Sequence, residues 1–362
     1  MTISYEKFGL KEVINASGRM TILGVSKVSE SVLAAQRFGG EHFFEMADLS
    51  EKTGAYLAGL LDVEDAQIVS SASAGIAQSV AAVIGQGEEY HAYHPYTPRI
   101  TRREIVLPKG HNVDYGTPVE VMVEMGGGTV VEAGYANMCT PEHIEMILTE
   151  ETAAVLYIKS HHTVQKSMLT VKDAAAAAHR GGVPLIVDAA AEEDLFKYIR
   201  DGADLVIYSG AKAIEGPSAG LVIGKKELVG WVRLQGKGIG RSMKIGKDNI
   251  LGFTQAVEDY LANGSESGAA MKERLAPFVA AVNEIPGLAA TIVQDSAGRD
   301  IYRASVKVTG SQTAKEVIQR LKQGNPAVYT REYQANNGII EFDVRSVNEN
   351  ELQKIVKQLA HI

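Results

Sequence analysis

The chain has 362 residues, with 36 Lys and Arg against 44 Asp and Glu, so its formal net charge at pH 7 is −8. This acidic balance argues against a protein that mainly neutralises phosphate backbones, which excludes generic nucleic-acid binding as a first hypothesis. The composition, with 45% hydrophobic residues, is globular and sufficient for two domains. The single cysteine, Cys139, excludes an internal disulfide framework. With no signal-peptide core and no apolar run of about 20 residues, we expect a cytoplasmic protein.

In chain order, residues 1–50 show no regular alternation, and we expect them to form an N-terminal arm. Between residues 51 and 250, short β-rich runs alternate with segments of helical length, which is typical of βαβ units. Most runs are apolar at successive positions, which predicts a mostly parallel sheet with helices on both faces. The predicted strands are 66–70, 104–108, 129–132, 153–158, 184–188, 204–208 and 220–224, and helices are expected at 73–84 and 171–180.

Residues 251–362 open with a long helical stretch, after which strands and helices alternate again. This pattern predicts a second, smaller α/β domain, with strands at 303–308 and 338–344 and helices at 313–323 and 348–359. The expected fold class is therefore α/β, with a large domain at 51–250 and a small C-terminal domain at 251–362.

Three polar residues follow or end predicted core strands. Ser209 comes directly after strand 204–208, Lys212 follows three residues later, and Asp188 ends strand 184–188. Ligands of open α/β sheets bind at the carboxyl ends of the strands, where a desolvated lysine can act as an amine nucleophile. A carboxylate, a lysine and a hydroxyl in this position are the parts of a pyridoxal-phosphate site: Asp for the pyridine nitrogen, Lys for the aldehyde and Ser for the phosphate. Taken alone, Lys212 would be interpreted as a solvated loop lysine, and it is Asp188 and Ser209 at matching strand ends that favour the cofactor site.

Small residues at 70–75 link a strand to a helix, and the backbone N–H groups around Ser71, Ala72 and Ser73 are expected to bind the phosphate. The alternative is tight packing at a strand–helix junction. His111 follows the next strand, so its imidazole is expected at the same rim, stacked on the pyridine ring. The alternative there is a solvated loop histidine.

Four segments together resemble fold-type I pyridoxal-phosphate enzymes of the selenocysteine synthase-like (SelA-like) group. They are Val13-Ile-Asn-Ala-Ser-Gly18, Ile186-Val-Asp188, Ser209-Gly-x-Lys-x-x-x-Gly-Pro-x-Ala-Gly220 and Asp343-Val-Arg-Ser-Val347. The resemblance covers nearly the whole chain. Within the group, the chain is most similar to the branch of D-glucosaminate-6-phosphate ammonia-lyases.

The resemblance implies a role for each matching residue. Lys212 would form the Schiff base with the cofactor, Asp188 would bond the pyridine nitrogen, Ser209 would help to hold the phosphate, and His111 would stack on the ring. Arg345 would bind the substrate carboxylate, because a guanidinium pairs with a carboxylate through two parallel hydrogen bonds. The alternative for Arg345 is a surface ion pair.

Two further segments are candidates for substrate binding. The stretch 225–247 carries seven Lys and Arg against one Glu. We expect Arg241, Lys244 or Lys247 to reach a phosphate, either the cofactor's or the substrate's, the alternative being a solvated helix face. The stretch 85–103 is rich in aromatic and basic residues, and Arg99 is expected beside the site. Its His91-x-x-His94 pair lacks a further ligand at metal spacing, so we expect no metal.

The activity implied by the resemblance is a pyridoxal-phosphate-dependent ammonia-lyase reaction on a 2-amino-3-hydroxy sugar acid phosphate, giving a 2-keto-3-deoxy sugar acid phosphate. Lys212 would remove the proton on the α-carbon, and His161 or His162 would protonate the leaving hydroxyl. The alternatives are another pyridoxal-phosphate reaction, such as selenium transfer, aldol cleavage or transamination, and a non-catalytic sugar-phosphate binding protein.

The expected partners are a small-molecule substrate and further copies of the same chain, as a homodimer or higher homo-oligomer. The SelA-like core begins at Val13, which leaves no room for the N-terminal tRNA-binding region of the selenium transferases. Together with the acidic charge, this predicts that the chain binds no nucleic acid. No membrane association is expected.

Overall fold

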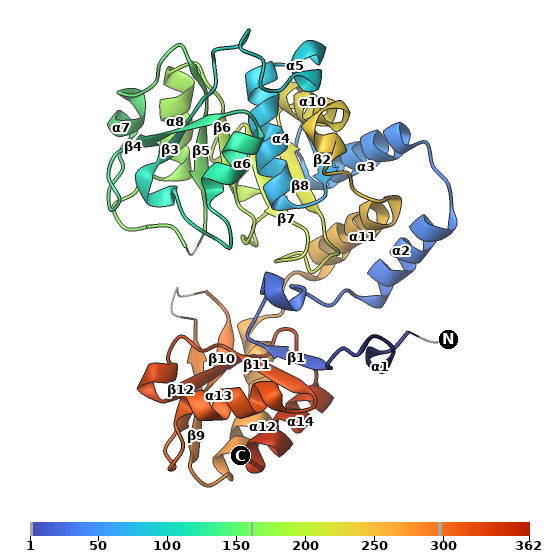
Figure 1. Cartoon of the computed structure of the whole chain (residues 1–362), viewed down its shortest axis with the longest axis vertical. Helices are drawn as coiled ribbons and strands as arrows, with labels where there is room; N and C mark the ends of the chain where they lie inside the picture. Colours follow the sequence, from blue (N-terminus) through green and yellow to red (C-terminus); the bar gives the residue numbers. More distant parts are fainter. Residues whose placement is uncertain (1–2, 161, 296–298) are drawn as a thin grey trace. The chain divides into compact units, whose positions relative to one another are not determined.

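The computed structural model of the chain describes residues 3–160, 162–295 and 299–362 (Figure 1). Its internal contacts divide the chain into two compact units. The larger unit is Val28–Asn263, and the smaller unit combines the residues up to Lys27 with Gly264–Ile362.

The larger unit is built on a seven-stranded sheet with the order β2-β8-β7-β6-β5-β3-β4. All strands run parallel except β8, which is antiparallel to both of its neighbours. The strands are β2 (Asp65–Val69), β3 (Glu104–Pro108), β4 (Thr129–Ala133), β5 (Thr152–Ile158), β6 (Leu185–Asp188), β7 (Leu205–Ser209) and β8 (Gly220–Gly224).

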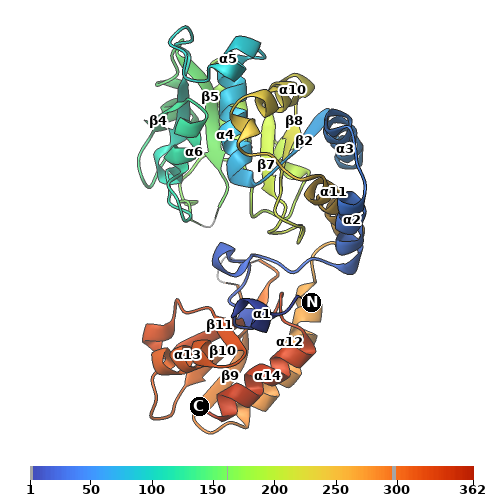
Figure 2. The same ribbon diagram turned by 45° about the vertical axis from the view of Figure 1, so that its right-hand side comes forward.

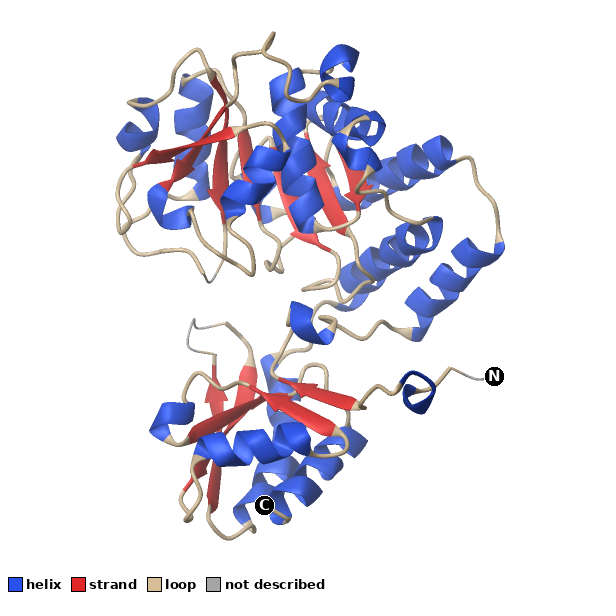
Figure 3. Cartoon of the chain, in the orientation of Figure 1, coloured by secondary structure: helices blue, strands red, loops and turns tan. Residues whose placement is uncertain are grey.

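Helices cover both faces of this sheet (Figure 3). Successive residues of one strand enter opposite cores: Ile105 and Leu107 pack with α4, α6 and α10, whereas Val106 packs with α3, α8 and α11. This is why the strands are apolar at successive positions. The helices are α2 (Glu30–Glu41), α3 (Met46–Leu61), α4 (Ala72–Gly85), α5 (Glu89–Tyr93), α6 (Val119–Met125), α7 (Pro141–Glu145), α8 (Val171–Arg180), α9 (Lys197–Arg200), α10 (Lys226–Leu234) and α11 (Lys247–Asn263). Short 3₁₀ turns are η2 (Lys109–His111), η3 (Gln235–Lys237) and η4 (Ile239–Arg241).

The smaller unit contains a three-stranded antiparallel sheet, β12-β10-β9, and a parallel pair, β1-β11 (Figure 2). Its strands are β1 (Val13–Ala16), β9 (Leu288–Gln294), β10 (Tyr302–Val308), β11 (Ala327–Thr330) and β12 (Ile339–Asp343). Its helices are α1 (Tyr5–Phe8), α12 (Gly268–Asn283), α13 (Ala314–Gln323) and α14 (Glu349–Ala360), with 3₁₀ turns η1 (Thr21–Leu23) and η5 (Ala335–Asn337). Capping boxes begin α13 at Thr313 and α14 at Asn348.

The nine predicted strands all occur, each with ends within one residue of the prediction. Strands β1, β9 and β11 were not predicted. The limits of the units also differ from the predicted domains. The expected arm of residues 1–50 is divided, because β1 pairs with β11 in the smaller unit while α2 packs on α11 in the larger one. For the same reason the larger unit extends to Asn263 rather than to residue 250.

Within the described residues, no helix combines the length and the apolar character needed to cross a membrane.

Candidate active site

The polar residues predicted from the strand ends gather at one edge of the large sheet. Because β2, β3, β6 and β7 run parallel, Ser71, His111, Asp188 and Lys212 all follow or end strands at the carboxyl edge. The antiparallel β8 begins at this edge, with Gly220 between Val69 of β2 and Ser209 of β7. Ligands of open parallel sheets bind at this edge.

The start of α4 offers unpaired backbone donors. Ser71 is the N-cap, and its Oγ accepts the N–H of Ala74 at 3.0 Å. The N–H groups of Ala72 and Ser73 make no hydrogen bond to other described residues. Together with the helix dipole, these two donors form a site for an anion. Gly220 lets β8 pass close by, since a Cβ there would lie 2.5 Å from the Ser71 backbone.

Lys212 is half-buried, and its ammonium makes no hydrogen bond or ion pair with any described residue. The turn that carries it is fixed by the backbone, because Gly210 N–H donates to the Ala219 carbonyl and Gly216 N–H to the Gly210 carbonyl, both at 2.8 Å. Ser209, at the end of β7, is half-buried and precedes this turn. The lysine is therefore held on a rigid turn without an internal partner.

Asp188 is 8% exposed, and its Oδ1 accepts the Ala190 N–H at 3.0 Å. Its Oδ2 accepts no hydrogen bond from the described residues. Burial raises the pKa of this carboxyl to about 6, although the charge of Lys212 acts in the opposite direction. A buried carboxylate without a bonded cation is costly, so this position favours a ligand with a positively charged donor.

His111 is fully buried and meets Tyr157 of β5 edge-on, with 4.5 Å between the ring centroids. Neither ring nitrogen makes a hydrogen bond of ordinary geometry to the described residues. Burial lowers its pKa to about 4, against the effect of the Val164 backbone nearby, so the imidazole is neutral at pH 7. A neutral, flat side chain fits the expected stacking role.

The turn that carries His111 is clamped from β4. The Glu132 carboxylate accepts Lys109 Nζ at 2.8 Å and Asn112 Nδ2 at 2.9 Å, so it holds the residues on either side of the 110–111 pair. Asn112 also donates to Glu120 at 2.6 Å.

Tyr115 belongs to this cluster and was not predicted from the sequence. Its hydroxyl lies 3.2 Å from Ser73 Oγ, in the first turn of α4. Burial raises the pKa of this phenol, and the negative charge of Asp188 acts in the same direction. The signal available in the sequence was its position four residues after His111, on a loop that leaves the same strand end.

The predicted proton donors lie after β5. His161 lies outside the described residues. His162 is exposed, and its backbone N–H donates to Ser160 Oγ at 3.3 Å. β5 ends at the same edge of the sheet, so the loop that carries His162 begins at the edge where the cluster lies.

The structure separates Arg99 from the carboxyl edge, which corrects the expected position of segment 85–103. α4 starts at the carboxyl edge and ends at Gly85, and the segment then returns to the start of β3, so it lies at the amino edge (Figure 1). Arg99 stacks on Tyr90 at 4.2 Å. Its neighbour Arg103 donates to four backbone carbonyls and fastens the segment to the fold. Nothing in this arrangement directs Arg99 toward Lys212.

The two histidines of segment 85–103 pack separately. His91 is buried against Gly85, and His94 packs on the Tyr90 ring at 4.4 Å. Among the described residues, no group of three or more His, Cys, Asp or Glu is arranged to hold a metal ion.

Arg241 and Lys244 are exposed on the segment that joins α10 to α11. This segment runs along the outer face of α4, since Gly240 packs against Gln78 of that helix. Lys247, at its end, binds the Gly39 and Gly40 carbonyls at the end of α2.

Arg345 lies in the smaller unit and forms a two-pronged pair with Asp343, through Nε at 2.9 Å and Nη2 at 2.8 Å. Asp343 is fully buried and also accepts Arg303 Nε at 3.0 Å. These two guanidinium groups hold the pKa of Asp343 down at about 2, although burial acts to raise it. The alternative of a surface ion pair does not describe this arrangement, since Arg345 is only 12% exposed.

The loop from β1 closes over this pair. Gly18 has a φ of +101°, and a Cβ there would lie 3.2 Å from Asp343 Oδ2. Asn15 fixes the loop by donating to the Gly18 carbonyl at 2.8 Å and accepting from the Ser17 N–H at 3.0 Å. The motif 13–18 is thus a cover for the Asp343–Arg345 pair within the smaller unit.

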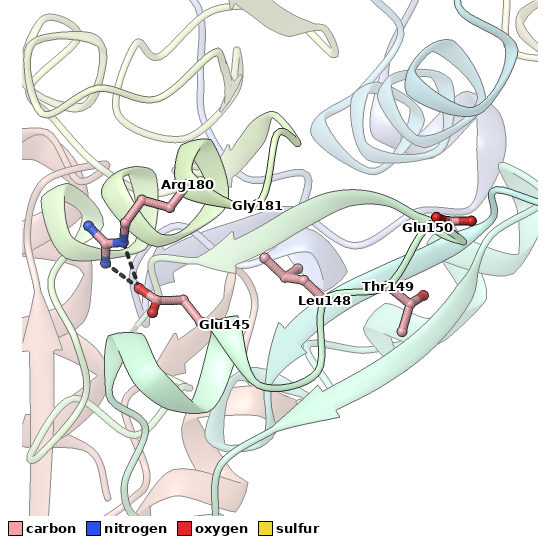
Figure 4. Close-up of a pocket in the computed structure, with 6 residues that line it drawn as sticks. All are labelled: Glu145, Leu148, Thr149, Glu150, Arg180 and Gly181. Carbon is pink, nitrogen blue, oxygen red and sulfur yellow. Dashed lines mark hydrogen bonds and ion pairs between the residues drawn. The ribbon is translucent and has the colours of Figure 1, made fainter.

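A hollow of about 560 Å³ lies elsewhere on the larger unit, and its lining comes from the end of α7, the loop before β5 and the end of α8 (Figure 4). In it Arg180 donates to Glu145, while Glu150 points away from that pair. The hollow is at the amino edge of β5, so it is separate from the Lys212 cluster. It is lined by Glu145, Leu148, Thr149, Glu150, Arg180 and Gly181.

The chain as a whole is similar to known proteins. The family model for SelA, L-seryl-tRNA selenium transferase, matches residues 99–312. D-glucosaminate-6-phosphate ammonia lyase from Salmonella typhimurium is 44% identical over 99% of this chain and 97% of its own length. A 5'-C-glycyluridine monooxygenase-decarboxylase from a Streptomyces species is 35% identical, over 100% of this chain and 92% of its own length.

Solved structures agree on the fold. A structure of D-glucosaminate-6-phosphate ammonia-lyase superposes with a TM-score of 0.94 at 43% identity, covering 100% of this chain and 98% of the other. A structure of SPT with PLP, 12% identical, covers 96% of this chain and 86% of the other with a TM-score of 0.58, which shows the fold alone. The predicted fold-type I α/β architecture is confirmed. The chain belongs to the SelA family.

Proposed function

We propose that this chain is a pyridoxal-phosphate-dependent ammonia-lyase that acts on a 2-amino-3-hydroxy sugar acid phosphate such as D-glucosaminate 6-phosphate. The products would be a 2-keto-3-deoxy sugar acid phosphate and ammonia. The main support is the 44% identity to an ammonia lyase of that name over 99% of the chain. The observation that carries the chemistry is the unpaired Lys212 on its rigid turn, in the same sheet edge as the buried Asp188.

The residues of the edge fit pyridoxal phosphate. The free N–H groups of Ala72 and Ser73, with the hydroxyls of Ser71 and Ser209, suit its phosphate. Asp188 has an oxygen without a hydrogen bond for the protonated pyridine nitrogen, and His111, buried after β3 at the same edge, is neutral and planar. When bound, this group supplies an electron sink for charge that develops on the substrate's α-carbon.

Proton movements then fall to side chains of this chain. Ionised Asp188 would keep the pyridine nitrogen protonated, because a carboxylate in a buried place stabilises the adjacent cation. The Lys212 amine would take the proton from the α-carbon, as it has no competing partner among the described residues. Loss of the C3 hydroxyl needs a proton donor, and we assign this to His161 or His162 in the loop after β5.

The carboxylate and the phosphate of the proposed substrate each need a cationic side chain as a partner. We propose that Arg345 binds the carboxylate, because Asp343 holds two of its nitrogens and so fixes the orientation of the guanidinium. We propose Arg241 or Lys244 for the substrate phosphate. Arg99 has no part in this proposal, since it lies at the amino edge and stacks on Tyr90. We further propose that the protein works in the cytoplasm as a homodimer or higher homo-oligomer.

The test is a product assay of the purified protein with pyridoxal phosphate and D-glucosaminate 6-phosphate. We expect one ammonia and one 2-keto acid for each substrate consumed, with activity lost by at least about a thousandfold in Lys212→Ala, because the base is removed. Lys172→Ala, on the exposed side of α8, is the matched control and should keep full activity.

The same assay separates the alternatives. Carbon dioxide release with oxygen uptake would indicate chemistry like that named for the Streptomyces relative, and amino transfer to an added keto acid would indicate a transaminase. Either result without ammonia would contradict the ammonia-lyase proposal. No turnover with tight binding would favour a sugar-phosphate binding protein.

A further inference from the structure

Tyr115 is fixed by a turn that is stabilised at several points. In this loop, residues 112–118, the Tyr115 N–H donates to the Thr117 carbonyl at 3.2 Å and the Gly116 N–H to Asp114 Oδ1 at 2.7 Å. Val119 N–H closes the loop on the Val113 carbonyl at 3.1 Å. The Tyr115 ring packs on the core that α4 shares with the sheet. The hydrogen bonds of the loop and the packing of the ring on this core therefore fix the position of the Tyr115 side chain.

The hydroxyl of Tyr115 reaches the first turn of α4. It lies 3.2 Å from Ser73 Oγ, and Ser73 is one of the two residues there whose backbone N–H is unpaired. Tyr115 thus contacts the helix start that would bind the phosphate end of the cofactor.

The donors at the start of α4 lack a charged member. The segment 70–75 contains no Lys or Arg, so the donors that it offers to a phosphate are backbone N–H groups and hydroxyls. Ser71 Oγ is already engaged as the cap of Ala74. A further neutral donor that stays protonated would add a hydrogen bond to a charged oxygen, which is stronger than one between neutral groups.

We propose that Tyr115 is a ligand of the cofactor phosphate: its hydroxyl, which contacts Ser73 in this structure, donates a hydrogen bond to a phosphate oxygen bound at the start of α4. The inference rests on the proposed function, since it takes pyridoxal phosphate as the ligand. Burial and the carboxylates of Asp188 and Asp114 raise the pKa of the phenol, which keeps it a donor at neutral and moderately alkaline pH.

The experiment compares pyridoxal phosphate with pyridoxal, which has the same ring and aldehyde but no phosphate. Cofactor-free wild type and Tyr115→Phe are titrated with each compound, and the dissociation constants are read from the absorbance change. Phenylalanine keeps the packed ring and removes only the hydroxyl. Tyr135→Phe, an exposed tyrosine at the carboxyl edge after β4, is the matched control.

We expect Tyr115→Phe to weaken pyridoxal phosphate binding by about tenfold or more and to leave pyridoxal binding unchanged. The dissociation constant of inorganic phosphate, obtained from its competition with pyridoxal phosphate, should also rise in Tyr115→Phe by a similar factor. Tyr135→Phe should match wild type throughout. These results would support the assignment, because the loss of affinity would occur only for compounds that carry a phosphate.

Two results would overturn it. Equal losses for pyridoxal and pyridoxal phosphate would show that Tyr115 acts through its ring or through folding, and equal binding by wild type and Tyr115→Phe would show that the hydroxyl is not a ligand. In both cases wild type still binds the cofactor, so the proposed function stands. Wild type that binds no pyridoxal phosphate at all would instead overturn the proposed function and this inference together.

Discussion

At the scale of single residues, Asp188 is the side chain that most clearly requires a positively charged partner. Its carboxyl is buried at the end of β6, one oxygen lacks a hydrogen bond among the described residues, and its pKa is raised to about 6. The ionised form is therefore unfavourable in the folded chain without a ligand. A cation bound beside Oδ2 would remove this cost, which is the role expected of the pyridine nitrogen.

The raised pKa makes the stability of the cofactor-free protein depend on pH. A carboxyl whose folded pKa lies above its unfolded value stabilises the fold at low pH, and this contribution is lost as the pH rises through the folded pKa. For a change from 3.8 to about 6, the loss approaches about 3 kcal/mol. Asp188→Asn should remove this dependence, so the variant should gain stability relative to wild type as the pH rises from 4 to 7.

Urea unfolding of both cofactor-free proteins at pH 4 and pH 7 measures this difference. Glu193→Gln, an exposed acidic residue five positions along the chain, is the control and should follow wild type. A constant difference between Asp188→Asn and wild type at both pH values would contradict the assigned pKa. Although Asp188→Asn should gain stability relative to wild type as the pH rises, it should bind pyridoxal phosphate more weakly than wild type does.

The sequence predicted those site residues whose positions follow from strand ends. Asp188, Ser209 and Lys212 each end or follow a strand that is apolar on both faces, and parallel strands end at one edge. Tyr115 could not be predicted in this way, because its direction depends on the hydrogen bonds of the turn 112–118. The expectation that Arg99 lies beside the site was wrong, because the composition of a loop does not tell at which edge of the sheet the loop lies.

At the scale of elements, the junction of β2, β8 and α4 shapes the anion site. Gly220 begins β8 directly against the backbone of Ser71, the residue that caps α4. The strand and the helix start must approach closely for the unpaired N–H groups to face the same edge as Ser209. The glycine is required by this close approach rather than by its backbone angle.

Gly220→Ala should therefore disturb both the fold and cofactor binding. The added Cβ would lie 2.5 Å from the Ser71 backbone, so the strand or the helix start must move. We expect a loss of about 1–3 kcal/mol in the free energy of unfolding and weaker binding of pyridoxal phosphate. Thermal unfolding and a cofactor titration measure the two effects.

Gly230→Ala in α10 provides the control. A Cβ at Gly230 meets nothing within 4 Å, and alanine favours a helix over glycine by about 1 kcal/mol. This variant should be as stable as wild type or more so, with unchanged cofactor binding. Similar behaviour of the two variants would show that the close approach at Ser71 is not needed.

Some elements were missed although their sequence is largely apolar. β9 reads Leu-Ala-Ala-Thr-Ile-Val-Gln, and only Ala290 of it is buried. β1 and β11 are four residues each and form their pair across about three hundred residues of chain. A pairing of that kind has no local signal.

At the scale of the whole molecule, the fold class followed from the sequence and the unit limits did not. The alternation of strands and helices predicted an α/β fold with a mostly parallel sheet, and the structures of related proteins share it. The first residues join the smaller unit because Ile14 and Ala16 are buried in its core with residues from the end of the chain. Such long-range burial cannot be read from a local pattern.

The proposed function requires Lys212 to form a covalent bond with pyridoxal phosphate at the carboxyl edge of the large sheet. The visible absorbance of the purified protein with pyridoxal phosphate, followed by borohydride reduction and peptide mapping, tests this directly. We expect an absorbance band that borohydride removes and a reduced cofactor on the peptide that contains Lys212. Neither should occur in Lys212→Ala, and Lys172→Ala should behave as wild type. A colourless wild-type protein, or a reduced cofactor attached to another lysine, would contradict this proposal.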